Sequence, residues 1–333
     1  MRAVITTGTG GPEVIALGTA DKPAPGKGEV LIDIAATAVN RADCAQRSGN
    51  YPPPPGASPI LGLECAGRIA ELGAGVTGWS VGDRVMTILS GGGYAEHATA
   101  PAGTLIKVPN AMSMVEAAAI TEVFMTAYLN IFIEAGFKAD ESVLIQGGAS
   151  GVGTAGIQLA KTLGAHSIFV TVGSADKARA CEALGADRAI LYKDENFADT
   201  INSLTGKRGV DVILDHIGGR NLAPNTACLA LRGRLVIIGL MGGIKAELNI
   251  GRLMVKRQRV IGSVLRSRNV AEKTAITEQF KAHVMPHFES GAIKPIIHDV
   301  INLEDARRGH ELMEANANTG KIVMRVNAEL CDG

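Results

Sequence analysis

The chain has 333 residues, 46% of them hydrophobic, and its 33 basic residues balance its 33 acidic residues. A chain of this length exceeds what one hydrophobic core usually organises, so two domains are expected. The zero net charge leaves no field that would attract nucleic acid or anionic lipid, and it favours a small-molecule partner.

No apolar run approaches the roughly 20 residues of a membrane helix, and the first residues, MRAVITTGTGG, lack the apolar core of a signal peptide. We therefore expect a cytoplasmic protein that spans no membrane. Five cysteines are scattered singly, at Cys44, Cys65, Cys181, Cys228 and Cys331. This spacing favours reduced, mostly buried thiols.

The chain up to about residue 110 reads as short strands broken by Gly and Pro, for example at residues 28–40 and 64–73. Such a pattern is typical of a β-rich domain with few helices. The tract YPPPPG, from Tyr51 to Gly56, should be a stiff surface loop, because proline lacks an N–H donor and restricts the residue before it.

From Glu141 the pattern changes to apolar strands that alternate with amphipathic helices at 151–163, 175–184 and about 222–231. Unbroken apolar strands with helices between them indicate a parallel sheet covered on both faces. Gly164, Gly185 and Gly233 follow these helices where left-handed C-terminal caps are expected.

The chain after Arg259 no longer follows this rhythm. A strand at 260–265 and a long helix precede a strand at 296–301, a helix at 303–315 and a strand at 321–326. We expect this C-terminal segment to return and complete the first domain, leaving a cleft between the two domains.

The strongest motif is VLIQGGASGVGTAGIQLAKTLGA, residues 143–165, an apolar strand followed by a glycine-rich turn and a helix. Glycines let the backbone approach a pyrophosphate, which free N–H groups at the helix N-terminus can bind. Two frames fit, one starting at Gly151 and one at Gly148. We prefer the second, with Gly148, Ser150 and Gly153, because it begins at the right distance from the strand.

The choice between the two nicotinamide cofactors is usually made about 20 residues further on, where an acidic residue binds the ribose in NAD enzymes. Here the strand ends at Gly173 and Ser174 without a carboxylate, so a 2′-phosphate fits, with Lys177 to neutralise it and Tyr192 to complete the pocket. Asp176 lies three residues past the usual acidic position. The alternative is that Ser174 caps the helix and Lys177 is simply solvated.

Nearly the whole chain resembles the medium-chain dehydrogenase/reductase superfamily, in its quinone oxidoreductase branch. The segments that carry this resemblance include AVNRADCAQRSGNYPPPPG, PILGLECAGRI, VGDRVM, GGYAEH, LDHIGG and MEANANTGKIV. GLMGG, VLRSR and MPHF are most similar to the stress-inducible, NADPH-dependent quinone oxidoreductases.

The resemblance implies an α/β protein with a GroES-like β-rich catalytic domain, residues 1–121 with 269–333, and a Rossmann cofactor domain, residues 122–268. It also implies a homodimer joined through the cofactor domains. Zinc members of the superfamily hold their metal with Cys and His at positions that here are Asn40 and Leu63. Leucine cannot bind zinc, so we expect no metal, although Cys44 and Cys65 lie nearby in sequence.

The resemblance places Asn40, Asp43 and Tyr51 at the nicotinamide and substrate cleft. Asn40 offers amide donors and an acceptor, and Tyr51 offers a phenolic O–H. Asn40 could equally cap the helix that begins beside it.

On the cofactor side, the resemblance carries over further positions, some of which could equally be packing residues, as for Met241 and Leu265. These positions are Met125, Thr126, Gly151, Val152, Gly239, Leu240, Met241, Leu265, Arg266, Ser267 and Asn316.

Without a metal, reduction of an ordinary ketone loses its main electrophilic assistance, so the acceptor must already be activated. The expected reaction is therefore NADPH-dependent hydride transfer to a quinone. An enone or alkenal reductase is the first alternative. An NADPH-binding protein of the crystallin type, whose contacts matter more than turnover, is the second.

Overall fold

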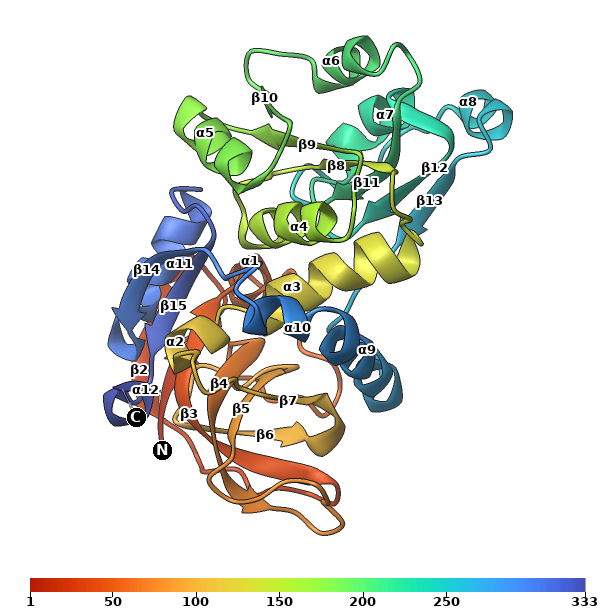
Figure 1. Ribbon diagram of the computed structural model, residues 1–333. Helices are drawn as coiled ribbons and strands as arrows, with labels where there is room; N and C mark the ends of the chain where they lie inside the picture. Colours follow the sequence, from red (N-terminus) through yellow and green to blue (C-terminus); the bar gives the residue numbers. More distant parts are fainter. Residues whose placement is uncertain (333) are drawn as a thin grey trace. The chain divides into compact units, whose positions relative to one another are not determined.

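The computed structural model describes residues 1–332, and the chain divides into two compact units. Unit 1 comprises residues 1–125 and 265–333, and unit 2 comprises residues 126–264. The unit boundaries therefore fall at 125/126 and 264/265, whereas the sequence suggested boundaries at 121/122 and 268/269. Figure 1 labels the elements of both units.

Unit 2 is built on one six-stranded sheet whose paired strands are all parallel. Its strands are β8 (Ser142–Ile145), β9 (Ser167–Val172), β10 (Arg188–Leu191), β11 (Val210–Asp215), β12 (Leu229–Ile237) and β13 (Arg259–Gly262). Their spatial order is β10-β9-β8-β11-β12-β13. This is the doubly wound order of a Rossmann fold, and it reverses beside β8, where such folds bind their ligands.

Helices cover both faces of this sheet. On one face α4 (Gly151–Thr162), α5 (Ala175–Leu184) and a π-helical turn (Leu129–Glu134) share a core with the strands. On the other face α6 (Phe197–Leu204) and α7 (Gly219–Ala227) contribute to a second core. Figure 1 shows α4 and α6 on opposite sides of the strands. A short helix, α8 (Ile250–Val255), precedes the edge strand β13.

The expected glycine caps have mixed outcomes. Gly164 and Gly185 adopt positive φ, at +86° and +118°, directly after α4 and α5. Gly233 instead lies inside β12, because α7 ends at Ala227 and the strand begins at Leu229. The predictions of a helix to residue 231 and of a cap at Gly233 are therefore wrong.

Unit 1 is built on a seven-stranded, mostly antiparallel sheet with a two-stranded hairpin. Its strands are β1 (Arg2–Thr6), β2 (Ile15–Thr19), β3 (Glu29–Val39), β4 (Glu64–Leu72), β5 (Arg84–Ile88), β6 (His97–Pro101), β7 (Leu105–Lys107), β14 (Ile297–Asn302) and β15 (Lys321–Arg325). Its helices are α1 (Arg41–Arg47), α2 (Met114–Ala117), α3 (Thr121–Tyr128), which continues into unit 2, α9 (Val270–His283), α10 (Met285–Glu289), α11 (Ala306–Glu314) and α12 (Ala328–Asp332).

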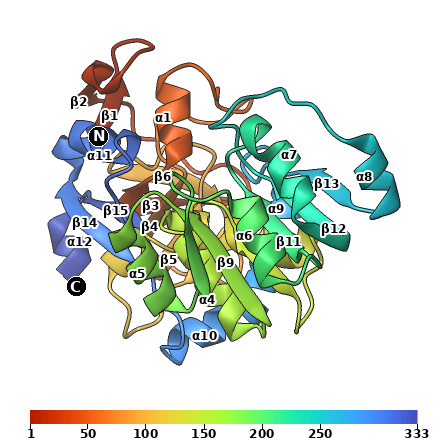
Figure 2. The same cartoon turned by 90° about the horizontal axis from the view of Figure 1, so that it is seen from above.

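The C-terminal segment completes unit 1, as expected. Strand β15 pairs antiparallel with β3, and β14 pairs with β15 at the edge of the same sheet. Figure 2 shows β14 and β15 beside β3 from a second direction. The tract from Tyr51 to Gly56 is a loop without regular structure, again as expected.

Candidate functional site

The glycine-rich turn lies between β8 and α4. Gly147 has φ +64°, and a Cβ on Gly153 would lie 2.5 Å from the carbonyl oxygens of Gly147 and Gly148. A Cβ on Gly148 would lie 2.5 Å from Val170. Only glycines permit this compact turn, so its geometry favours the frame that begins at Gly148.

The same turn presents donors at the start of α4. Ser150 is the N-cap, and its Oγ accepts a hydrogen bond from the Gly153 amide at 3.0 Å. Among residues 1–332, no hydrogen-bond partner is recorded for the amides of Gly151 and Val152. Two unpartnered amides at a helix N-terminus are suited to an anionic group.

The end of β9 holds the residues expected to select the cofactor. A Cβ on Gly173 would lie 2.8 Å from the Tyr192 hydroxyl, so a side chain here would fill the space between them. Ser174 caps α5, since its Oγ accepts from the Lys177 amide at 3.4 Å. Asp176 pairs with Arg179 on the exposed surface. The capping interpretation of Ser174 therefore holds in the structure, while its O–H remains able to donate.

The other expected cofactor contacts differ in accessibility. Met125 and Leu265, both in unit 1, are buried, at 0% and 7% exposed, while Thr126 is partly buried. Leu240 and Met241 are about half exposed, at 56% and 49%. A Cβ on Gly239 would lie 2.7 Å from the carbonyl oxygen of His216.

Asn316 and Ser267 are both exposed in unit 1. Asn316 follows α11 with φ +52°, and its Oδ1 accepts from the Arg41 guanidinium at 2.7 Å. The side chain of Asn316 thus links the end of α11 to Arg41 at the start of α1 through a hydrogen bond.

Asn40 takes part in a buried ionic network. Its Nδ2 donates to Glu64 Oε1 at 3.0 Å and to the Ala38 carbonyl at 3.3 Å, and its Oδ1 accepts from Lys321 Nζ at 2.6 Å. Lys321 and Glu64 form an ion pair at 2.8 Å, with side chains 3% and 0% exposed. Both amide protons of Asn40 are therefore used inside unit 1, which leaves only acceptor capacity on Oδ1.

Asp43 is fully buried and closes the start of α1. Its Oδ2 accepts hydrogen bonds from the backbone N–H of Asn40 at 2.8 Å and from the Tyr94 hydroxyl at 3.1 Å. Its Oδ1 accepts from the backbone N–H of Gly62 at 3.0 Å. Burial raises the pKa of Asp43 to about 6. Asp43 is therefore a positioning residue, because its hydrogen bonds hold Asn40 and the loop before β4 in place.

Tyr51 is partly buried, with the Arg266 guanidinium 5.1 Å from its ring centroid. Arg266 is itself buried and donates to the carbonyl oxygens of Ser90 and Tyr51 and to Gln46. No partner of the Tyr51 hydroxyl is recorded among the described residues. We expected Arg266 to bind the cofactor. In the structure its guanidinium instead contacts Tyr51 and holds the loop that carries this residue.

The zinc positions hold no ligand set. Leu63 is 1% exposed, and the nearby thiols of Cys44 and Cys65 are buried. Burial raises the pKa of both thiols, that of Cys44 to about 12. Within residues 1–332, no cluster of three His, Cys, Asp or Glu side chains is arranged to hold a metal ion.

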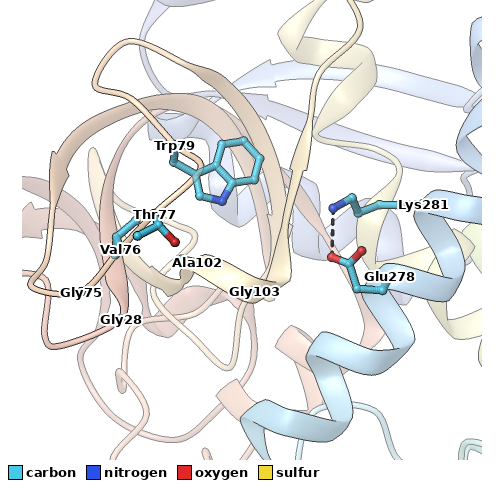
Figure 3. Close-up of a pocket in the computed structure, with 9 residues that line it drawn as sticks. All are labelled: Gly28, Gly75, Val76, Thr77, Trp79, Ala102, Gly103, Glu278 and Lys281. Atoms are coloured by element: carbon cyan, nitrogen blue, oxygen red, sulfur yellow. Dashed lines mark hydrogen bonds and ion pairs between the residues drawn. The ribbon is translucent and has the colours of Figure 1, made fainter.

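A separate pocket of about 390 Å³ lies in unit 1, away from these residues (Figure 3). Trp79 and Thr77 line one side, and Glu278 and Lys281 of α9 line the other. The two charged side chains pair with each other at 2.9 Å. Nothing in this lining points to a ligand.

Several polar residues of the site were not expected from the sequence: Glu64, Tyr94, Thr121, Glu122, His310 and Lys321. The signal for three of them is a charge in an apolar run: Glu64 in GLECAG, Glu122 in AAITEVFM and Lys321 in GKIVM. Charged residues are rarely buried unless they are paired or functional, so such a charge indicates a special role.

In the part of the chain that the structure describes, no helix has the length and apolar character needed to span a bilayer.

Comparisons with known proteins agree with this architecture. Residues 26–110 match the family model described as the alcohol dehydrogenase GroES-like domain, and residues 151–281 match the model described as zinc-binding dehydrogenase. A quinone oxidoreductase of Rattus norvegicus is 33% identical over 329 residues, which cover 97% of each chain.

Two solved structures are also similar over nearly the whole chain. A mycobacterial protein complexed with NADPH is 32% identical, with a TM-score of 0.89 over 98% of this chain and 100% of that one. An Escherichia coli quinone oxidoreductase complexed with NADPH is 29% identical, with a TM-score of 0.87 over the same shares. With the Rossmann strand order and the GroES-like match, these likenesses place the chain in the medium-chain dehydrogenase/reductase superfamily, among its quinone oxidoreductase-like members.

Proposed function

We propose that this protein reduces quinones by hydride transfer from NADPH, without a metal. The observation that carries the proposal is the site around Asn40. One of the two expected zinc positions is a leucine, Leu63. At the other, the side-chain amide of Asn40 is hydrogen-bonded to Glu64 and Lys321. These donors form no metal-binding set, so the chemistry suits an acceptor that is already activated.

The residues of unit 2 fit the cofactor. The unpartnered amides of Gly151 and Val152 suit its pyrophosphate, and the glycines of the turn leave room for close approach. Gly173, Ser174, Lys177 and Tyr192 would hold the 2′-phosphate. When bound, NADPH supplies the hydride. The solved relatives complexed with NADPH support this choice.

The chain's own contribution is to orient the acceptor. The Tyr51 hydroxyl, on a loop held by Arg266, would donate a hydrogen bond to the substrate oxygen. Charge that arrives with the hydride spreads over a conjugated acceptor, so modest stabilisation is enough. An enone or alkenal meets the same requirements and is the second candidate. A role as an NADPH-binding protein of the crystallin type is the third.

We further propose a homodimer formed through unit 2. Its edge strand β13 has no outer neighbour in the sheet, and exposed apolar residues lie on this strand and on α8, the helix that precedes it in the chain. These residues include Val260 at 37%, Ile250 at 64%, Met254 at 71% and Val255 at 81% exposed. An unpaired edge with apolar surroundings suits pairing with a second copy.

Cytoplasmic location is part of the same proposal. All five cysteines are buried and none of them is joined in a disulfide, which suits a reducing compartment.

The test is stopped-flow NADPH oxidation with ortho-quinones, para-quinones and alkenals. Fast oxidation with quinones is expected. If only alkenals support NADPH oxidation, the second candidate is selected. If none of the acceptors supports NADPH oxidation although NADPH binds tightly, the third is favoured.

A further inference from the structure

Unit 1 buries four cationic side chains among its described residues, and two of them have a carboxylate partner. Lys321 pairs with Glu64 at 2.8 Å, and Arg47 pairs with Glu314 at 2.5 Å. Such pairing is the expected arrangement, because an uncompensated charge in the interior is costly.

The other two buried cations, Arg266 and Lys273, have no such partner. Arg266 is 5% exposed, and Lys273, in the first turn of α9, is 9% exposed. Among residues 1–332, neither side chain forms an ion pair, and all the acceptors of their hydrogen bonds are neutral oxygens. Glu122 interacts electrostatically with both cations but forms an ion pair with neither. The two positive charges are therefore left without a bound anion.

Ser90 brings these two cations together. Lys273 Nζ donates to Ser90 Oγ at 2.7 Å. The Arg266 guanidinium donates to the Ser90 carbonyl oxygen, from Nε at 3.0 Å and from Nη2 at 2.8 Å. Both cationic groups thus contact the same residue, one at its side chain and one at its backbone. Like charges held this close repel each other, and an anion beside them would relieve that repulsion.

The two cations also keep unused donors. A guanidinium has five N–H groups, and four hydrogen bonds of Arg266 are recorded: two to Ser90, one to the Tyr51 carbonyl oxygen at 3.3 Å and one to Gln46 Oε1 at 2.5 Å. An ammonium has three N–H groups, and Lys273 uses one of them on Ser90. One N–H group of Arg266 and two of Lys273 therefore have no acceptor among the described residues.

The cation pair lies beside the residue assigned to the acceptor. The Arg266 guanidinium is 5.1 Å from the ring centroid of Tyr51 and donates to the carbonyl oxygen of the same residue. Tyr51, Ser90 and Gln46 are all partly exposed, so the surroundings of the two buried cations are open to solvent. A small anionic group can therefore approach them from the side of Tyr51.

We propose that Arg266 and Lys273 form a binding site for an anionic group, a carboxylate or a sulfonate, that the acceptor carries. This inference rests on the proposed function and deepens it by naming the substrate class, conjugated acceptors with an acidic substituent. Tyr51 binds the oxygen that is reduced, and the cation pair binds the acidic group. Charge-assisted hydrogen bonds of this kind are short and strong, and they select for charge as well as shape.

The first test needs neither cofactor nor acceptor, and its probe is sulfate. An anion that binds only the folded protein raises the Tm. Millimolar sodium sulfate is compared with sodium chloride at the same ionic strength, in the wild type, Lys273→Met and Lys281→Met. Lys281 is the matched control, because it lies on the same helix and its ammonium already pairs with Glu278 at 2.9 Å.

We expect a sulfate-specific rise of the Tm in the wild type and in Lys281→Met, and its loss in Lys273→Met. Lys273→Arg keeps the charge and should keep most of the rise. Equal rises in the wild type and in Lys273→Met would overturn the site.

The second test uses turnover of two acceptors that differ in charge, a phenanthrenequinone carboxylate and its methyl ester. The wild type should prefer the carboxylate in kcat/KM by about tenfold or more, the effect of one charge-assisted hydrogen bond. The preference is a ratio, so a general loss of activity in a variant cancels. Lys273→Met should bring the ratio close to one, while Lys273→Arg and Lys281→Met should retain most of it. Sulfate should raise the KM of the carboxylate by competition.

The outcomes separate the two proposals. A wild-type protein that oxidises NADPH with neither acceptor refutes the proposed function, while the sulfate test still reports the anion site. A wild type that turns over both acceptors with equal kcat/KM refutes the acidic substrate class, and a sulfate effect would then mean that the site takes a free anion. A preference for the carboxylate that persists in Lys273→Met refutes the role of Lys273.

Discussion

The Lys321 ammonium lies 2.8 Å from the Glu64 carboxylate, and the two side chains are 3% and 0% exposed. Removal of one partner leaves an uncompensated charge in the interior, which typically costs about 3–5 kcal/mol. Lys321→Met should therefore strongly destabilise the protein in urea unfolding. The double variant Lys321→Met with Glu64→Gln should recover part of the loss.

Lys281→Met is the control for this pair. It breaks a partly exposed ion pair with Glu278 and should change the free energy of unfolding by less than about 1 kcal/mol. If Lys321→Met costs no more than Lys281→Met, the buried pair does not stabilise unit 1.

Lys177 tests the choice of cofactor. A charge-assisted contact with the 2′-phosphate is worth roughly 1.5–3 kcal/mol, or about tenfold to a hundredfold in affinity. Lys177→Ala should weaken NADPH binding by this factor and leave NADH binding almost unchanged, as measured by fluorescence titration. Lys138→Ala, at an exposed position, is the control. Equal losses for the two cofactors would remove Lys177 from the phosphate pocket.

Tyr51→Phe keeps the ring under Arg266 and removes only the hydroxyl group. If the phenol stabilises developing charge on the acceptor, kcat and kcat/KM for quinones should both fall by about tenfold, corresponding to roughly 1.4 kcal/mol. NADPH affinity should stay the same. Intact turnover in Tyr51→Phe combined with reduced turnover in Tyr51→Ala would make the residue a packing surface.

The side chains around Asn40 and Leu63 predict an enzyme that needs no zinc. Elemental analysis of the purified protein should show no stoichiometric zinc, and activity should survive chelator. One tightly bound zinc per chain, lost together with activity, would contradict this expectation.

His310 makes the stability of unit 1 depend on pH. Burial, and then the Arg47 charge, lower its pKa from 6.5 to about 3. Between these values the unfolded chain binds one more proton than the folded chain, so this contribution to stability is full above pH 6.5 and is lost as the pH falls toward 3.

His310→Gln should therefore flatten the fall in the free energy of unfolding between pH 6.5 and 4. Asp43 acts in the opposite direction, because its pKa is raised to about 6, and it is present in both proteins. The difference between the wild type and the variant thus isolates His310. Parallel pH profiles would show that His310 titrates normally.

The sequence predicted the doubly wound sheet well, because alternating apolar strands and helices are a local pattern. It missed α6, although Asn196 caps this helix by accepting hydrogen bonds from the amides of Ala198 and Asp199. It also extended α7 into β12, where Arg232 adopts φ +60° and lets the strand run through a helix-favouring segment. Here the pairing with β11 overrides local preference.

The polar residues of the site show the same division. The turn from Gly148 to Gly153 was predictable because strand, glycines and helix are consecutive. Glu64 and Lys321 are 257 positions apart, and they meet only because β4 and β15 pair with the two sides of β3. No local pattern can match such partners.

Unit 2 lies between the two segments of unit 1 in the sequence, so the two units can complete their folding at the ribosome only in a fixed order. Unit 2 is one continuous stretch, so it has all its strands as soon as β13 emerges. Unit 1 must wait for β15, the last strand of its sheet. Until then the last residues of β3, 36–39, have an unpaired edge, and Glu64 lacks its partner Lys321. A ribosome that stalls before Lys321 therefore leaves a complete unit 2 joined to a unit 1 whose sheet lacks its strand β15.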